Sequence, residues 1–138
     1  MLDRIVALDM GTVRIGVAVS DPLGSFAQGV GVWDAQGDWL SQLGELLTTT
    51  KASKAVIGLP MRENGTKGPS AERVELEVER IKEAFPDLDI VMWDERYTST
   101  IANRILIEGD VSRKKRKGQV DKVAATVILQ GYLDSLRR

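Results

Sequence analysis

Residues 4–20, which read RIVALDMGTVRIGVAVS, decide the fold of this chain. The run 4–9 is almost continuously apolar, as is typical of a central strand covered on both faces. Gly11-Thr12 then turns the chain. In the next segment, 14–20, bulky residues alternate with small ones: Ile15, Val17 and Val19 with Gly16, Ala18 and Ser20. The pattern predicts a hairpin whose second strand has one bulky face and one small face.

Further strands and helices follow this hairpin. Residues 28–33 predict a weaker, glycine-interrupted strand at a sheet edge, and later segments alternate between helical and strand periodicity. The other expected elements are a helix over about 37–50, a strand over 55–60, a long helix capped by Ser70 and ending near Pro86, a strand over 89–95, a short helix from Thr98 to Gly109, a basic loop, and a final helix over about 120–136. The order is therefore βββαβαβαα.

This order predicts an α/β fold. Strand-crossover rules favour parallel strands at about 4–9, 55–60 and 90–95, and the hairpin then completes a mixed five-stranded sheet with helices on both faces. The 138 residues, 43% hydrophobic and 28% charged, fit one compact domain over 1–138. No apolar run approaches the length of a membrane span or of a signal peptide's core. We therefore expect a cytoplasmic protein with no membrane partner.

The composition also excludes several kinds of catalysis. The chain has no cysteine and no histidine, which removes disulfides, thiolate nucleophiles, imidazole ligands and Ser-His-Asp triads. Any catalysis must use carboxylates, hydroxyls, lysines or a hard metal ion. The net charge is −1, so a nucleic-acid partner would have to be attracted by local basic patches.

Acidic residues gather at one predicted edge of the sheet. Asp9 ends the first strand, and Asp94 and Glu95 end the last one. Asp121 is expected in the first turn of the final helix, from which it can point back over the same edge. In open α/β sheets this carboxyl edge is where sites form. Carboxylates gathered there repel one another unless a proton or a hard cation intervenes, and the set suits Mg²⁺ or Mn²⁺. For each residue alone, a solvated turn or a helix-dipole role is the alternative.

Four motifs in order resemble one known family. They are LDMGTVRIGVA at 8–18, GLP at 58–60 with NGT at 64–66, DERYTS at 94–99, and VDKVAA at 120–125 with ILQ at 128–130. Together they resemble the YqgF (RuvX) family over nearly the whole chain. The resemblance implies an RNase H-like, RuvC-related fold. It also implies a nuclease that has been described both as a Holliday junction resolvase and as maturing the 5′ end of precursor 16S rRNA.

The resemblance also implies an acidic triad. Carried over by position, the triad falls on Asp9, on one member of the Asp94-Glu95 pair, and on Asp121. The longer reach of Glu95 favours it over Asp94, and both stay candidates. No acidic residue ends the strand at 55–60, where RuvC-type resolvases place one, so the last strand must supply that ligand. The expected reaction is Mg²⁺- or Mn²⁺-dependent hydrolysis of a phosphodiester.

Cations near this edge are candidate nucleic-acid contacts. Arg14 and Arg96 flank the acids and either position phosphate or balance the carboxylates. Five consecutive cations precede Asp121, and we expect them in a loop that binds phosphate, with a solvated loop as the alternative. These five are Arg113, Lys114, Lys115, Arg116 and Lys117. The segment 61–69 is expected to be either a mobile loop over the cleft or a simple strand-to-helix connection.

The sequence is also compatible with functions other than a nuclease. Asp9-x-Gly11-Thr12 followed by Gly16 also resembles the first phosphate motif of sugar-kinase and actin-like ATPases, but those bind nucleotide between two such domains. A non-catalytic RNA-binding module for ribosome assembly is a further alternative. Sequence does not separate pre-rRNA from branched DNA as substrate. Symmetric nicking of a four-way junction would require a homodimer, because one site cuts one strand.

Overall fold

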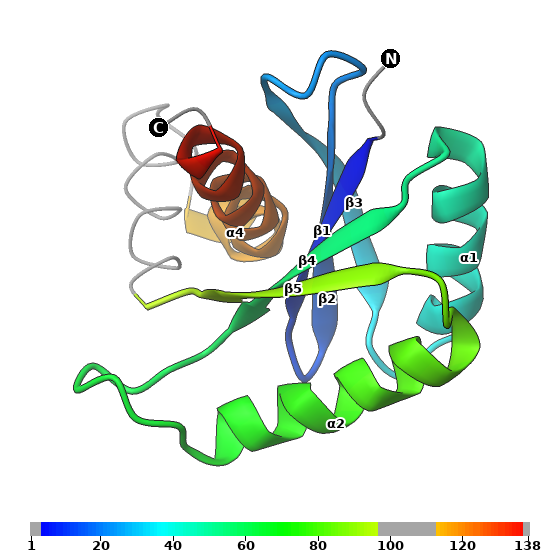
Figure 1. Ribbon diagram of the computed structural model, residues 1–138. Helices are drawn as coiled ribbons and strands as arrows, with labels where there is room; N and C mark the ends of the chain where they lie inside the picture. Colours follow the sequence, from blue (N-terminus) through cyan, green and yellow to red (C-terminus); the bar gives the residue numbers. More distant parts are fainter. Residues whose placement is uncertain (1–3, 97–112, 137–138) are drawn as a thin grey trace.

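A five-stranded sheet forms the centre of the computed structural model, which describes residues 4–96 and 113–136, with backbone only for 113–121 (Figure 1). The strands are β1 (Ile5–Met10), β2 (Arg14–Ser20), β3 (Ala27–Asp34), β4 (Lys54–Leu59) and β5 (Asp89–Asp94). The helices are α1 (Trp39–Thr50), α2 (Pro69–Ala84) and α4 (Arg113–Ser135). The short helix expected over 98–109 lies outside the described residues.

The strand order is β3-β2-β1-β4-β5. Strand β1 pairs antiparallel with β2, and β2 pairs antiparallel with β3. Strand β1 is parallel to β4, and β4 is parallel to β5, so these three strands end at the same edge of the sheet. The mixed sheet, the parallel trio and the edge position of β3 were all predicted from the sequence and are confirmed.

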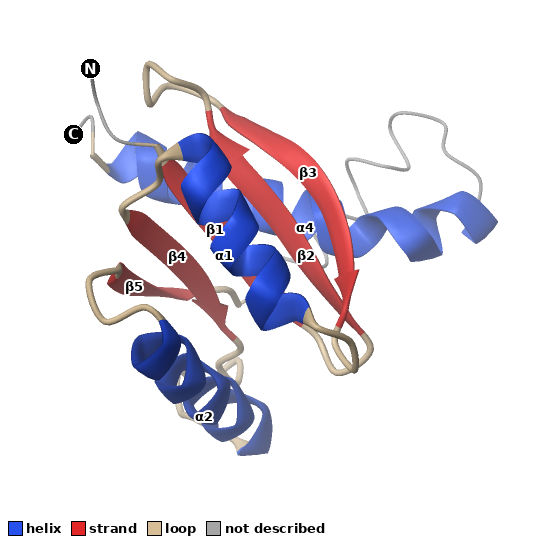
Figure 2. Ribbon diagram, turned by 90° about the vertical axis from the view of Figure 1, so that its right-hand side faces the viewer, coloured by secondary structure: helices blue, strands red, loops and turns tan. Residues whose placement is uncertain are grey.

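Helices cover both faces of this sheet. Helices α1 and α2 lie on one face and α4 lies on the other (Figures 1 and 2). The bulky residues of β2, such as Ile15 and Val17, belong to the core beneath α1 and α2, while the smaller Ala18 packs with Ile128 and Leu129 of α4. The alternation in β2 thus assigns the large side chains to the two-helix face and lets the single helix approach closely.

Two predicted helix starts were wrong. Helix α2 begins at Pro69 after the N-cap Gly68, so Ser70 lies inside the helix instead of capping it. The fixed φ of proline suits a first helical position, where its missing N–H is no loss. Helix α4 begins at Arg113, so the basic run is helical and not a loop. Lysine and arginine are good helix formers, and Gly118 inside the helix costs only about 1 kcal/mol.

Among the helices of the described residues, none combines the length and the apolar character that crossing a bilayer requires. The longest of them, α4, carries most of its charged residues in its first ten positions.

Candidate metal-binding active site

Asp9 lies near the carboxyl end of β1, on the face covered by α4. Its neighbours in the strand, Leu8 and Met10, belong to the core on the opposite face, so alternation directs Asp9 toward α4. On the β2 side its partner in the register is Gly16. On the β4 side, Leu8 pairs with Ile57, and Gly58 comes next along that strand. The neighbouring strands therefore place glycines, which have no side chain, next to Asp9.

Glu95 reaches the same place from the end of β5. Its backbone N–H donates to the carbonyl of Leu59 at 3.1 Å, which extends the pairing of β5 with β4 by one residue. Its carboxylate lies over Gly58. A Cβ atom at Gly58 would lie 2.6 Å from Oε2 of Glu95 and 2.6 Å from Cδ1 of Ile128, so only glycine fits there without displacing them.

The two carboxyl groups interact directly. Burial, the charge of Asp9 and a hydrogen bond with Asp9 together raise the pKa of Glu95 to about 9, and the nearby charge of Asp94 adds to the rise. The Arg73 guanidinium acts in the opposite direction, to lower that pKa. The raised pKa favours the protonated form of Glu95, hydrogen-bonded to Asp9, when no cation is bound. A proton held between two carboxylates marks a position that a divalent cation can take.

Arg73 is a site residue that the sequence analysis missed. It comes from α2, and its Nη2 donates to the backbone carbonyl of Met10 at 2.8 Å, directly after Asp9. The side chain is half-buried, and its charge is felt by Glu95. One signal was available in the sequence. Arg73 directly precedes Val74 of the buried helical stripe, which places a cation beside the apolar face of that helix.

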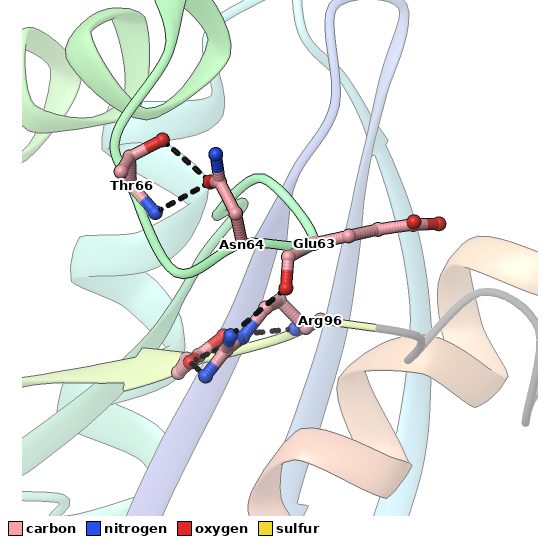
Figure 3. Close-up of polar contacts among 5 residues, drawn as sticks. Glu63, Asn64, Thr66 and Arg96 are labelled. Atoms are coloured by element: carbon pink, nitrogen blue, oxygen red, sulfur yellow. Dashed lines mark hydrogen bonds and ion pairs between the residues drawn. The ribbon is translucent and has the colours of Figure 1, made fainter.

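Asp94 does not join this pair. Its carboxylate accepts from Nε and Nη2 of Arg96, both at 2.8 Å, and from the Arg96 backbone N–H at 3.0 Å. Nη1 of Arg96 in turn donates to the backbone carbonyl of Glu63 at 3.2 Å (Figure 3). Of the two candidates at the end of β5, the structure brings Glu95 to Asp9 and brings Asp94 to Arg96.

The third predicted acid lies in α4. Asp121 is about two turns inside this helix and not in its first turn, because the helix begins earlier than expected. Its side chain, like those of the basic run 113–117, lies outside the described residues. Within the described part of the chain, no group of three or more Asp, Glu, His or Cys side chains is assembled for a metal ion. Arg14, at the start of β2, is half-buried and pairs in register with Asp34 of β3.

A family model described as "RuvX: Holliday junction resolvase" matches residues 3–135. The chain belongs to the RuvX family. A relative from Bacillus thuringiensis (strain Al Hakam), named "Putative pre-16S rRNA nuclease", is 46% identical over 136 residues, covering 96% of this chain and 98% of the relative. A relative of the same name from Bacillus cereus (strain AH820) matches equally well. The family and the enzyme class predicted from the sequence agree with these findings.

Solved structures confirm the fold. The fowlpox virus resolvase in complex with Holliday junction DNA matches this RuvX-family chain with a TM-score of 0.64 at 13% identity, covering 98% of this chain and 99% of that one. Thermus thermophilus RuvC with a Holliday junction substrate matches with a TM-score of 0.58 at 11% identity, covering 99% and 96%. The predicted RNase H-like, RuvC-related fold is therefore present.

Proposed function

We propose that this chain is a metal-dependent nuclease of the cytoplasm that hydrolyses phosphodiester bonds of structured nucleic acid. Its proposed role is the maturation of the 5′ end of precursor 16S rRNA. The observation that carries the proposal is the carboxyl pair of Asp9 and Glu95, held together over Gly58 at the carboxyl edge of a RuvX-family fold. The names of the 46%-identical relatives support the rRNA substrate.

The residues present fit a hard divalent cation. Asp9 and Glu95 offer only oxygen ligands. Burial, together with the charge of Asp9, raises the pKa of Glu95 to about 9, and a dication would offset both effects by stabilising the charged carboxylates. Mg²⁺ and Mn²⁺ prefer such donors. We propose that Asp9 and Glu95 hold the ion with Asp121 as a third ligand from α4. When bound, the ion would supply an activated water and stabilise charge on the phosphate oxygens.

The remaining residues have supporting roles in this proposal. Arg73 fixes the end of β1 through the Met10 carbonyl and so holds Asp9 in place. Gly58 keeps the space that the Glu95 carboxylate occupies. We propose that Arg14 and the cations of 113–117 bind substrate phosphates. Such contacts would make binding strongly dependent on salt.

A competition assay tests both the activity and the substrate. Purified protein would be given a labelled RNA that contains the 5′ precursor region of 16S rRNA together with a labelled four-way DNA junction, with Mg²⁺ or Mn²⁺ and, in parallel, with EDTA. We expect metal-dependent cleavage of the RNA at a higher kcat/KM than the junction. Binding without cleavage of either substrate, under all metal conditions, would support a non-catalytic RNA-binding module instead.

Junction resolution is the second candidate function. The family description and the fold shared with two junction resolvases favour it. It makes a distinct prediction, because symmetric nicking of opposite strands requires two active sites and therefore a homodimer. Paired nicks in the junction, together with a dimer in solution at the assay concentration, would assign this function in place of rRNA processing.

A further inference from the structure

The segment between β4 and α2 forms a small, ordered hairpin. Met61 and Lys67 form an antiparallel bridge, and the N–H of Arg62 donates to the carbonyl of Thr66 at 2.9 Å. The Asn64 side-chain oxygen accepts from the backbone N–H of Thr66 at 3.1 Å and from its hydroxyl at 2.7 Å (Figure 3). We call residues 61–67 the edge hairpin, because it follows the carboxyl end of β4.

The edge hairpin is tied to the end of β5 by one side chain. Arg96 directs Nη1 to the Glu63 carbonyl in the hairpin, while Nε and Nη2 hold Asp94 at the end of β5. The hairpin turn fits against this guanidinium. Gly65 has a φ of +85°, and a Cβ atom there would lie 3.3 Å from Nη1 of Arg96. Glu95, which contacts Asp9, lies between Asp94 and Arg96 in the chain, and the charge of Asp94 acts on it, so the tie lies next to the carboxyl pair.

The energetics of this tie indicate a positioning role. The side chains of Arg96 and Asp94 are 37% and 42% exposed, and an exposed ion pair contributes only about 0–1 kcal/mol to folding stability. The geometry is nevertheless specific. A planar guanidinium donates hydrogen bonds to a carboxylate and to a carbonyl at the same time, whereas a lysine ammonium lacks this planar set of donors. The arrangement therefore contributes little to stability but fixes the orientation of the hairpin.

We propose that Asp94 and Arg96 form a latch that holds the edge hairpin beside the carboxyl pair, and that the latched hairpin guides the sugar-phosphate backbone of the substrate onto that pair. This inference rests on the proposed nuclease function. In it, Asp94 is a positioning residue and not a metal ligand. Asn64 uses its side-chain oxygen inside the turn, which leaves its amide NH₂ as the donor toward a phosphate or ribose oxygen.

Arg96→Lys separates the latch from a simple phosphate-binding charge. Lysine keeps the positive charge but loses the paired N–H donors of the guanidinium. If the latch exists, Arg96→Lys should therefore change KM as much as Arg96→Ala does. For both variants we expect KM to rise by about tenfold, or about 1.4 kcal/mol, with kcat at saturating substrate changed by less than about twofold. Near-normal KM in Arg96→Lys, together with a raised KM in Arg96→Ala, would overturn the latch in favour of direct phosphate binding.

A double-mutant cycle tests whether latch and hairpin act together. Asp94→Asn removes the charge that orients Arg96, and Gly65→Ala introduces a Cβ atom at a positive φ that only glycine adopts without strain. If both act through the hairpin, the double variant should have about the same KM as the more affected single variant. Additive effects on KM would contradict the proposal. Glu79→Gln is the matched control, because it breaks an exposed ion pair with Lys82 on α2, at 3.4 Å, and should leave KM unchanged.

Binding measurements keep this test independent of the proposed function. The Kd for the precursor RNA, measured in EDTA, should rise in Arg96→Lys and Asp94→Asn but not in Glu79→Gln. A wild-type protein that binds RNA without cutting it would overturn the nuclease proposal alone, because the same Kd values still report on the latch. Unchanged Kd and KM in both latch variants would overturn the latch alone. A wild-type protein that neither binds nor cuts would overturn both.

Discussion

The two faces of the sheet differ sharply at the carboxyl end of β1. On the face toward α1 and α2, Leu8, Met10 and Ile57 are at most 4% exposed and fill the core. On the face toward α4, the alternating positions hold Asp9 and Gly58, and Glu95 reaches over the glycine. At this end of β1, one face gains stability from buried apolar surface, and the other holds two carboxyl groups that repel each other only when both are charged. Neighbouring residues of β1 therefore have different roles. Substitutions on the core face should mainly lower stability, and substitutions on the carboxyl face should mainly lower activity.

The largest expected effect is on activity, at Asp9. Asp9→Asn keeps the size of the side chain but removes the charge that we propose holds the metal ion. We expect cleavage to fall by about a thousandfold or more, equivalent to about 4 kcal/mol of transition-state stabilisation, with no loss of thermal stability. Single-turnover cleavage and a thermal melt measure the two properties. Cleavage at the wild-type rate in Asp9→Asn would rule out the acidic site.

The matched change on the other face is Leu8→Ala. Leu8 is fully buried, so truncation leaves a cavity and should lower the free energy of unfolding by about 3 kcal/mol. Cleavage by the folded protein should fall by less than about tenfold, because Leu8 points away from the carboxyl pair. Urea denaturation gives the stability, and cleavage is assayed at a temperature where the variant is folded. A loss of cleavage as large as that of Asp9→Asn would show that the two faces are not separable.

The sheet could be predicted from the sequence because the strand segments have a clear pattern of apolar residues. The apolar run at 4–9 and the bulky-small alternation at 14–20 determine strand type, facing and pairing with little competition from other patterns. Helix starts were less predictable. Ser70 is a favoured capping residue, but Pro69 was equally suited to the first helical turn, and the cations of 113–117 have helical propensity that their charge pattern obscures.

The candidate site was predictable only in part. The predicted strand ends put Asp9 and the Asp94-Glu95 pair at the same edge of the sheet. Which of the two acids lies closer to Asp9 depends on the path of the chain just after β5, and the sequence does not show that path. In the structure, Glu95 reaches Asp9 and Asp94 reaches Arg96. Arg73 could not be assigned, because its contact with the Met10 carbonyl depends on how α2 packs against the sheet. Tertiary packing of this kind leaves no periodic signal in the sequence.

An intermediate effect is expected at Gly58. This glycine lies beneath the Glu95 carboxylate and directly follows Ile57, which belongs to the core on the opposite face. Gly58→Ala places a Cβ atom within 2.6 Å of both Glu95 and Ile128, so one of them must move. We expect a loss of about 1–2 kcal/mol in unfolding free energy and a fall of about a hundredfold in cleavage, because the carboxyl pair is displaced. Gly44→Ala in α1 is a control, since its added Cβ atom meets only the Phe85 ring, at 3.3 Å. Equal cleavage losses in the two variants would contradict a specific role for the space at Gly58.

The smallest effect is a gain of stability in Glu95→Gln, and it depends on pH. The folded protein raises the pKa of Glu95 from 4.5 to about 9, so it binds the proton more tightly than the unfolded chain does. The stability contributed by protonated Glu95 is therefore complete below the unfolded pKa and is lost as the pH rises toward the folded pKa. In EDTA, Glu95→Gln should melt on the order of a few °C above wild type near the upper end of this range, with the difference shrinking toward acid pH.

Metal ions should reverse the order of these two proteins. If Asp9 and Glu95 hold a divalent cation, adding Mn²⁺ at alkaline pH stabilises the wild type by mass action and leaves Glu95→Gln nearly unchanged, because the amide is a weaker ligand. Leu8→Ala, on the other face, should gain as much thermal stability from Mn²⁺ as the wild type does. A pH-independent difference in EDTA would contradict the carboxyl pair, whereas equal Mn²⁺ responses in wild type and Glu95→Gln would contradict only the metal site. The pair and its proposed ion are thus tested by separate measurements on one variant.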